Sequence, residues 1–423
     1  MRFVSVSLLC FSLVSCRQLT DWPQFRGPDG QGHSDSAGIP LHWSETVSVA
    51  WKTPVPGEGW SSPVVSNDQV WMTTATEEGR SLRALSFDRK SGRLLHNVEV
   101  FQPKEPGSHH TQNGYASPTP VTDGEHVFVH FGPRGTACLD TDGNIVWRNT
   151  ELQFAALQGA ASSPILHGSL LLLTCDGTDK QFVAAVNKST GKLKWKTPRE
   201  HFLEAHSKSP IARMAYSTPL VIDVDGVAQL VSTGADHVVA YDVETGKEIW
   251  WFQYDGFSLV ARPSFGNGLV YIVGSIKLDH HAVYAIRPGK GQIQDEQVVW
   301  QRSVGIPHVP SPLLVGKELL VVHDGGVGTC LDAMTGEVHW KERLGGNYRA
   351  SPIEVRGRIY VCNAEGKTVV LAAGKNFETL ATNKLDGTFY ASPAVAGRAL
   401  FLRSNTHLYR LEETGLEIDP SID

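Results

Sequence analysis

The chain has 423 residues, with 38 lysines and arginines against 44 aspartates and glutamates, which gives a formal net charge of −6. This mild acidity and the lack of any basic run argue against a nucleic-acid partner, which would need a clustered basic surface. A chain of this length ordinarily indicates two or three domains, but all-β folds and repeat folds depart from that rule.

The first 15 residues are expected to be a signal peptide. Arg2 is followed by the apolar run 3–15, which is too short to span a bilayer. The segment 13–16, LVSC, resembles a bacterial lipobox, in which Cys16 would be lipidated; a plain secreted protein cleaved nearby is the alternative. We therefore expect an exported, periplasmic protein in which residues 16–46 form a tether and a lipidated Cys16 supplies any membrane contact.

Residues 47–412 contain eight copies of one unit. Each copy has small residues and a Ser-Pro, Thr-Pro or Arg-Pro step before an apolar run, and the anchor prolines are Pro63, Pro118, Pro164, Pro219, Pro263, Pro312, Pro352 and Pro393. Their mean spacing of about 47 residues is close to the length of a propeller blade. Within a copy, short apolar or β-branched runs are separated by glycine, aspartate or asparagine turns. These features predict an all-β, closed eight-bladed β-propeller with four strands per blade.

The turn before the fourth strand repeats a glycine and a tryptophan. In the sixth copy, 331–340 reads LDAMTGEVHW; Gly336 suits the positive φ of a tight hairpin, and Asp332 can bond the turn amides. The fifth copy has a longer turn, and the seventh is degenerate. Outer-strand tryptophans are expected at Trp51, Trp147, Trp195, Trp250, Trp300 and Trp340.

The strand count predicts how the ring closes. The first seven units have a fourth strand after their turns, whereas the eighth ends near residue 412 in a polar tail, 413–423. An unmatched outer-strand sequence that includes Trp51 lies upstream, at 47–55. We expect this N-terminal strand to complete the last blade, because closure protects open sheet edges.

The turn and anchor motifs, over about residues 47–412, resemble the pyrroloquinoline quinone (PQQ)-like propeller repeat family. The resemblance implies that the outer-strand tryptophans dock between blades, where an indole buries a large area and keeps one N–H for a carbonyl. One branch of the family comprises dehydrogenases that hold PQQ and Ca²⁺ over the channel; the BamB-like branch is non-catalytic. The chain looks more like the second branch, because it lacks a vicinal cysteine pair, a Trp-x-Trp floor and large insertions. The segment 21–34, DWPQFRGPDGQGHS, also resembles BamB-like propellers.

Residues just before the anchors are expected around the channel mouth, because the connections between blades gather at one end of a propeller. Four of the eight residues that lie three positions before an anchor are aromatic. With their neighbours, they give the candidate binding residues Trp60, Tyr115, Tyr216, Arg262, His308, Tyr348, Arg349 and Tyr390. A concave surface with aromatic walls and a few polar groups suits a ligand or a peptide. Simple packing of the loop bases is the alternative.

Metal sites are not favoured by the histidine-rich segments. His109 and His110 lie in a longer connection, 107–115, that could overhang the mouth, but adjacent residues on an extended chain point to opposite sides. The segments 279–281, DHH, and 140–144, DTDGN, are better explained as hairpin turns.

Two cysteine pairs occupy equivalent places in adjacent units. Export would permit disulfides between them, and buried free thiols are the alternative. The pairs are Cys138 with Cys175 and Cys330 with Cys362.

The sequence therefore predicts a non-enzymatic, monomeric, exported propeller that binds an envelope protein or a small ligand and needs no cofactor. The rival is a quinoprotein oxidoreductase with PQQ and Ca²⁺ at the channel mouth, where Arg262 or Arg349 would pair with cofactor carboxylates. Neither a G-x-S-x-G elbow nor an H-E-x-x-H motif occurs in the sequence.

Overall fold

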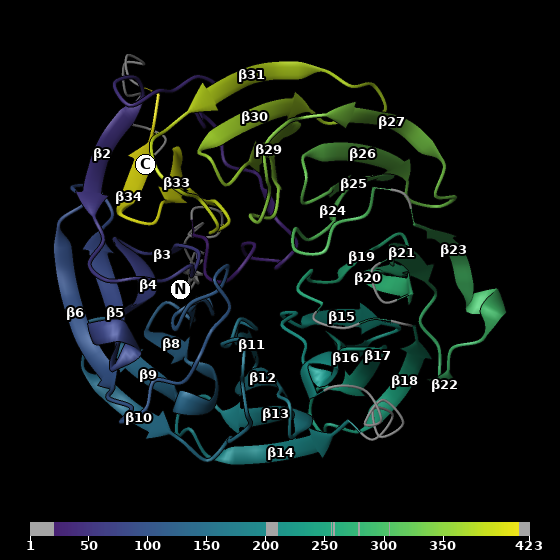
Figure 1. Ribbon diagram of the computed structural model, residues 1–423, viewed down its shortest axis with the longest axis horizontal. Helices are drawn as coiled ribbons and strands as arrows, with labels where there is room; N and C mark the ends of the chain where they lie inside the picture. Colours follow the sequence, from purple (N-terminus) through teal and green to yellow (C-terminus); the bar gives the residue numbers. More distant parts are fainter. Residues whose placement is uncertain are drawn as a thin grey trace, which may run out of the picture.

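The computed structural model describes residues 21–199, 210–254, 256, 259–277, 280–303 and 305–413. It is an eight-bladed β-propeller, as predicted, with the blades arranged around a central axis (Figure 1). We number the blades 1 to 8 by the chain order of their inner strands. The predicted signal peptide, Cys16 and most of the predicted polar tail lie outside the described residues. No helix in the described part of the chain is long and apolar enough to cross a membrane.

Blades 1 to 7 have the four strands given below in chain order from the axis outwards, and blade 8 takes its outer strand from the N-terminal end of the chain. Those of blades 1 and 2 are β3 (Val64–Ser66), β4 (Gln69–Thr76), β5 (Ser81–Asp88), β6 (Leu94–Phe101), β7 (Val121–Thr122), β8 (His126–His130), β9 (Thr136–Asp140) and β10 (Ile145–Asn149). Those of blades 3 and 4 are β11 (Ile165–His167), β12 (Leu170–Asp176), β13 (Gln181–Asn187), β14 (Leu193–Pro198), β15 (Leu220–Val224), β16 (Val227–Thr233), β17 (His237–Asp242) and β18 (Glu248–Gln253).

The second half of the ring follows the same order. Blades 5 and 6 contain β19 (Ser264–Gly266), β20 (Leu269–Lys277), β21 (His280–Ile286), β23 (Val298–Arg302), β24 (Leu313–Val315), β25 (Glu318–Val322), β26 (Val327–Asp332) and β27 (Val338–Arg343). Blades 7 and 8 contain β28 (Ile353–Val355), β29 (Arg358–Cys362), β30 (Lys367–Ala372), β31 (Thr379–Lys384), β32 (Ala394–Ala396), β33 (Ala399–Arg403), β34 (His407–Leu411) and β2 (Val49–Pro54). The 3-10 segments in the described chain are η1 (Glu77–Gly79), η2 (Gly132–Arg134), η4 (Pro210–Arg213) and η5 (Asp295–Gln297).

The burial of each strand follows its place in the blade. All seven residues of β12 are buried, whereas the outer strand β14 has exposed and partly buried residues. The second and third strands are sandwiched between neighbouring blades, and their sequences are therefore continuous apolar runs rather than alternating ones. The core is accordingly a series of clusters at blade boundaries, such as the one that Leu172 and Val183 of blade 3 form with Leu230 and Val239 of blade 4.

The ring closes with strands from both ends of the chain. β2 pairs antiparallel with β34, with Trp51 opposite Arg410, and supplies the outer strand of blade 8. This confirms the predicted closure. A propeller closed in this way leaves only short, protected edges.

The repeated glycine and tryptophan serve two different blade boundaries. The Gly336 backbone has φ +70°, and a Cβ there would lie 2.7 Å from the ring of Trp300 in the preceding blade. Trp300 in turn donates its indole N–H to Ala333 O in that same turn, at 2.8 Å. The turn of blade 6 thus receives the tryptophan of the blade before it, and its own Trp340 reaches the blade after it. Trp51, Trp147, Trp195 and Trp340 also donate to a carbonyl of the following blade.

Trp250 does not follow the docking role that the resemblance implied. Its indole N–H donates to Gln229 Oε1 within its own blade, at 2.8 Å. The following blade has the longer turn, and the extra strand β22 (Gly291–Gln292) from that turn pairs alongside Trp250. Where another outer-strand tryptophan docks, a carbonyl in the following blade's turn accepts the indole N–H. At this boundary the longer turn takes the place of that short turn.

Residues 21–46 pack against the propeller, which differs from the tether that we expected over 16–46. This segment, called the strap below, begins with Trp22, which is fully buried and exchanges two backbone hydrogen bonds with Val65. Farther along, β1 (His33–Ser34) pairs parallel with β28 of blade 7. The strap therefore crosses the axis between opposite sides of the ring (Figure 1).

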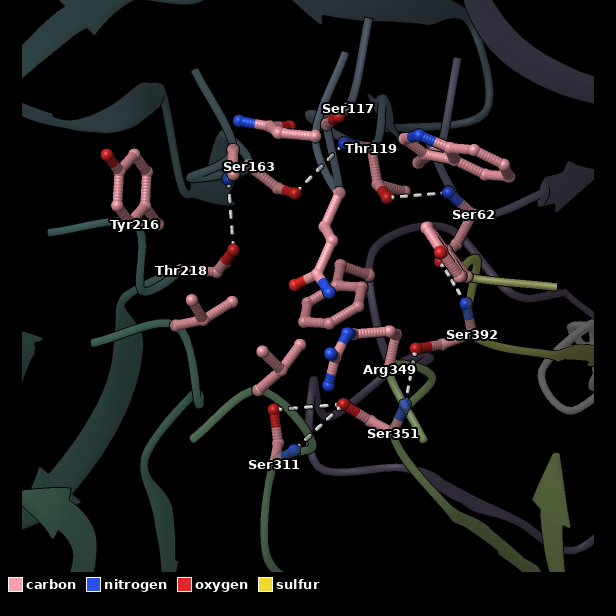
Figure 2. Close-up of a pocket in the computed structure, with 18 of the residues that line it drawn as sticks. Ser62, Ser117, Thr119, Ser163, Tyr216, Thr218, Ser311, Arg349, Ser351 and Ser392 are labelled. Atoms are coloured by element: carbon pink, nitrogen blue, oxygen red, sulfur yellow. Dashed lines mark hydrogen bonds between the residues drawn. The ribbon is translucent and has the colours of Figure 1, made fainter. Parts of the chain in front are cut away.

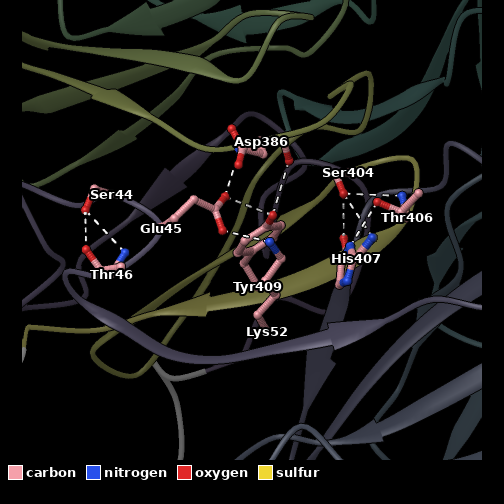
Figure 3. Close-up of polar contacts among 9 residues, drawn as sticks. All are labelled: Ser44, Glu45, Thr46, Lys52, Asp386, Ser404, Thr406, His407 and Tyr409. Atoms are coloured by element: carbon pink, nitrogen blue, oxygen red, sulfur yellow. Dashed lines mark hydrogen bonds and ion pairs between the residues drawn. The ribbon is translucent and has the colours of Figure 1, made fainter.

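The end of the strap is fastened to the last blade. The Glu45 carboxylate accepts hydrogen bonds from Lys52 Nζ at 2.7 Å, from the Asp386 amide at 2.7 Å and from the Tyr409 hydroxyl at 3.1 Å (Figure 3). These partners come from β2, from the approach to blade 8 and from β34. They hold the strap beside the strand that closes the ring.

Candidate functional site

One end of the propeller axis holds a cavity of about 350 Å³, which we call the well (Figure 2). Its walls come from the connections that lead into the inner strands of all eight blades, and the strap contributes one residue, Phe25. A volume of this size is at the small end of the range for ligand pockets.

The structure changes the anchor that we assigned in the second unit. Inner strand β7 begins at Val121, directly after Pro120, so Pro120 rather than Pro118 matches the anchors of the other blades. The residue three positions before it is then Ser117, not Tyr115. With this correction, the equivalent residue of every blade lines the well: Trp60, Ser117, Ala161, Tyr216, Val260, Val309, Arg349 and Tyr390.

Tyr115 lies outside the lining. Its ring packs edge-on against His109, and its hydroxyl donates to Gly107 O at 3.2 Å. It therefore braces the 107–115 connection. That connection overhangs the well, as the sequence suggested, through His110, Gln112 and Asn113.

A belt of serine and threonine hydroxyls runs around the well, one residue before each anchor proline. The Ser62 amide donates to Thr119 Oγ1, the Thr119 amide to Ser163 Oγ and the Ser163 amide to Thr218 Oγ1, each at 2.9 Å. The belt resumes at Ser311 and returns through Ser351 and Ser392 to Ser62 Oγ. Figure 2 shows these bonds as a chain of dashed lines around the well. The Ser-Pro motif predicts a strand start, and its repetition is also the sequence signal for this belt.

Arg262 replaces the belt hydroxyl in blade 5 and does not line the well. Its guanidinium donates to Pro219 O at 3.1 Å and to Phe25 O of the strap at 2.7 Å. Burial, with a smaller contribution from Arg26, lowers the pKa of Arg262 to about 9. The one break in the belt is therefore one of the places where the propeller holds the strap.

The strap closes the far end of the well. The inner strands begin at the well, and the strap bonds to positions farther along them: Trp22 with Val65, and Pro23 O with the Thr122 amide. Phe25 lines the well but belongs to this crossing segment, so its ring reaches the cavity from the opposite end. The channel is consequently a blind well rather than an open pore.

Aromatic rings form part of the well wall. The rings of Trp60 and Tyr390 have centroids 4.4 Å apart and an interplanar angle of 39°. The Tyr216 hydroxyl donates to Gln158 Oε1 at 2.7 Å. Three of the predicted aromatic residues, Trp60, Tyr216 and Tyr390, are thus part of the lining. Phe25 is a fourth aromatic residue there, and sequence reasoning missed it.

Arg349 and His308 share one carboxylate. Arg349 Nη1 donates to Asp324 Oδ1 at 2.7 Å, and the His308 amide donates to Asp324 Oδ2 at 2.7 Å. The His308 ring stacks on His281, with centroids 4.8 Å apart. Tyr348, although next to Arg349 in sequence, is fully buried between blades 6 and 7, and burial raises the pKa of its hydroxyl.

No metal cluster is found at the histidine-rich segments. Among the residues described, no group of three or more His, Cys, Asp or Glu side chains could hold an ion. His109 Nδ1 contacts His110 O, and 140–144 is a turn in which Asp140 accepts from Asn144. Asp279 of the DHH segment lies outside the described residues.

The four cysteines of the propeller are free and buried. The alternative of buried thiols thus matches the structure, and the two disulfides are not formed. Burial raises the pKa of Cys138 to about 12 and that of Cys362 to about 11. Thiols with a raised pKa carry little thiolate and are poor nucleophiles.

A buried ion pair lies beside the well. Arg199 Nε is 2.9 Å from Asp176 Oδ1, and the two side chains are 0% and 1% exposed. Burial raises the pKa of Asp176 to about 6, although Arg199 opposes the shift. A small crevice that contains Asp176 and His130 shares Ala161 and Tyr216 with the well. Sequence reasoning gave no indication of this pair.

A family model described as outer membrane protein assembly factor BamB matches residues 41–150, 86–226 and 183–415. Methanol dehydrogenase [cytochrome c] subunit 1 of Methylobacterium organophilum is 26% identical over 207 residues, which is 45% of this chain and 32% of that protein. Outer membrane protein assembly factor BamB of Legionella pneumophila (strain Paris) is 25% identical over 211 residues, which is 47% of this chain and 51% of that protein. The chain thus spans about half or less of the length of these two relatives.

Solved structures show the same architecture. The quinohemoprotein alcohol dehydrogenase from Comamonas testosteroni has a TM-score of 0.65 and 10% identity, over 95% of this chain and 84% of that chain. At this identity the likeness shows the fold alone, because one fold hosts many functions. Dehydrogenase-like and BamB-like propellers are therefore both related to this chain at low identity.

Proposed function

Because the chain belongs to the PQQ-like repeat family whose model is described as outer membrane protein assembly factor BamB, we propose that it is an exported, non-enzymatic binding protein that holds a ligand in the well. The observation that carries this proposal is the blind well itself. Every blade places at least one side chain in its wall, and the strap supplies a further one. A preformed concave site in which aromatic rings and hydrogen-bonding groups face one cavity is suited to a ligand.

The lining residues argue against the rival reading, an oxidoreductase with PQQ and Ca²⁺. Calcium takes oxygen ligands, chiefly carboxylates, and PQQ is itself a polycarboxylate that needs cations. Yet none of the lining residues in the described chain is an aspartate or glutamate. Asp324 lies behind the wall, and both its oxygens already accept hydrogen bonds from Arg349 and His308. The residues present do not fit a PQQ–Ca²⁺ centre.

We place this binding protein in the cell envelope. The apolar segment 3–15 supports export, and the motif that ends at Cys16 supports attachment to a membrane through a lipid. The relationship to BamB from Legionella pneumophila is consistent with an envelope role. A monomer suits a closed ring, which needs no partner to cover a sheet edge.

Filling the well should remove its ligand. The change is Ala161→Trp, which would put an indole into the cavity. Protein purified from its native envelope is analysed by native mass spectrometry, and small molecules released on denaturation are identified. We expect the wild-type protein to retain a small molecule that Ala161→Trp lacks.

Val146→Trp is the matched control, because Val146 is 50% exposed on the outer strand β10, away from the well. It should retain the ligand. Equal occupancy in Ala161→Trp and the wild type would contradict the proposal.

A further inference from the structure

The polar lining of the well is mostly neutral. In the described chain, eleven serine, threonine, asparagine and glutamine side chains line it, against one arginine and no carboxylate. A ligand that matches this lining needs many neutral hydrogen-bonding groups and few charges, since polar groups that lose water without finding a partner weaken binding.

Six of the seven belt hydroxyls donate to no acceptor in the described part of the chain. Each belt oxygen already accepts a backbone N–H, which leaves it one lone pair and its own hydrogen, and this hydrogen can rotate towards a ligand. The Ser351 hydroxyl donates to Ser311 Oγ at 3.0 Å. The other six have no acceptor among the described residues, and they belong to Ser62, Thr119, Ser163, Thr218, Ser311 and Ser392. The wall therefore suits a ligand rich in oxygen acceptors.

Arg349 offers room for a single negative charge. Its Nη1 is occupied by Asp324 Oδ1 and Tyr348 O, whereas its Nε and Nη2 have no partner in the part of the chain that the structure describes. The guanidinium points into the well, between the belt hydroxyls (Figure 2). The Nε/Nη2 edge of a guanidinium can donate two parallel hydrogen bonds to one carboxylate.

Two buried arginines at the closed end of the well also favour a negatively charged ligand. The guanidinium groups of Arg26 and Arg262 are fully buried where the strap crosses the axis, and Asp29 is the acid that opposes them. Arg26 donates to the carbonyls of Pro312 and Gln31 rather than to a carboxylate. A positive potential at the closed end attracts an anion, and more strongly inside a protein than in water.

The rings of Trp60 and Tyr390 provide the remaining surface. Their faces meet at 39°, which makes an angled wall rather than a flat slot for a planar molecule. The face of an aromatic ring carries partial negative charge and attracts weakly positive C–H groups. A pyranose ring has such C–H groups on one face and hydroxyl oxygens around its rim.

We infer that the well binds an acidic sugar, a pyranose with one carboxylate such as a uronic acid, alone or at the end of an oligosaccharide. Its carboxylate lies on the Nε/Nη2 edge of Arg349, its C–H face on Trp60 and Tyr390, and its ring oxygens face the belt. A planar aromatic acid would leave most belt donors unmatched. This inference rests on the proposed function and names the ligand class of the same site.

The test is calorimetric titration of the full chain with glucuronate and galacturonate, and with glucose, galactose and the uncharged methyl ester of glucuronate. We expect the uronates to bind about tenfold to a hundredfold more tightly than the uncharged sugars, the effect of one charge-assisted pair. Arg349→Gln should abolish this preference. Arg343→Gln, at an exposed position of outer strand β27, should keep it. Unchanged circular dichroism and melting temperature would show that both variants fold.

Two results would overturn the inference. Equal binding of charged and uncharged sugars would remove the role of Arg349. Failure of every sugar to bind at millimolar concentration would do so as well. If Ala161→Trp still removes a different native ligand, the well remains a binding site and only the ligand class is wrong. If Ala161→Trp removes nothing, the proposed function fails too.

Discussion

Trp22→Ala is expected to lower the free energy of unfolding by about 3–5 kcal/mol, the usual cost of deleting a large buried aromatic side chain. Trp22 is fully buried and belongs to the core cluster of the strap and blades 1, 7 and 8, which also contains Val65, Val70 and Phe87. A loose tether would contain no such position. Chemical denaturation of the variant and the wild type measures the difference.

Val47→Ala is the matched control, since Val47 is 51% exposed just after the strap. We expect it to change stability by less than about 0.5 kcal/mol. Limited proteolysis gives a second readout, because a detached strap should be cleaved within 21–46 before the blades are. A loss of less than about 1 kcal/mol in Trp22→Ala, with no new cleavage, would show that the strap does not contribute to the fold.

Asp176→Asn is expected to cost about 3–5 kcal/mol of unfolding free energy at neutral pH. The substitution removes the Asp176 carboxylate from the fully buried Arg199, whose guanidinium also donates to Ser232 O and Oγ. Breaking a buried ion pair is far more costly than breaking a surface pair, because burial removes the hydration of the charges. Denaturant titration at constant pH measures the effect.

Two comparisons make this result specific. Asp123→Asn breaks the partly exposed pair with Lys188, at 2.8 Å, and should cost about 1 kcal/mol or less. The double variant Asp176→Leu, Arg199→Met removes both charges and should recover much of the loss. If Asp176→Asn were no more destabilising than Asp123→Asn, the pair would not be the buried, coupled unit that the structure shows.

The architecture could be predicted from the sequence because it repeats. Eight anchors gave the blade count, and the spare strand with Trp51 gave the closure. The exceptions were harder to foresee. Trp250 shares the Gly-to-Trp spacing, but its partner depends on the long turn of the next blade, and the pairing of β22 with β18 has no local sequence signal.

The strap was misjudged because it has no periodic pattern. It is rich in glycine, proline and serine, the composition of a linker, and its buried contacts with distant blades arise only in the closed ring. Trp22 and Trp43 were the available signal, since linkers seldom carry such residues. Arg262, the exception in the Ser-Pro series, marks where the strap is held, but nothing in its own sequence names Phe25 as its partner.

The site could be placed at one end of the ring but not assembled residue by residue. Trp60, Tyr216, His308, Arg349 and Tyr390 line the well, whereas Tyr115, Arg262 and Tyr348 do not. Tyr115 was misplaced because the segment ASPTP contains two prolines, Pro118 and Pro120. Only the start of β7 identifies Pro120 as the anchor. The belt was missed because a repeated motif was read as scaffold alone.

The central claim is that the well binds a ligand and performs no quinone chemistry. The direct measurement is calorimetric titration with PQQ and Ca²⁺, followed by dye reduction with alcohols and sugars as substrates. The account predicts no Ca²⁺-dependent binding of PQQ and dye reduction at the rate without protein, since no carboxylate lines the well in the described chain. Tight Ca²⁺-dependent binding with substrate turnover, both lost in Ala161→Trp, would contradict it.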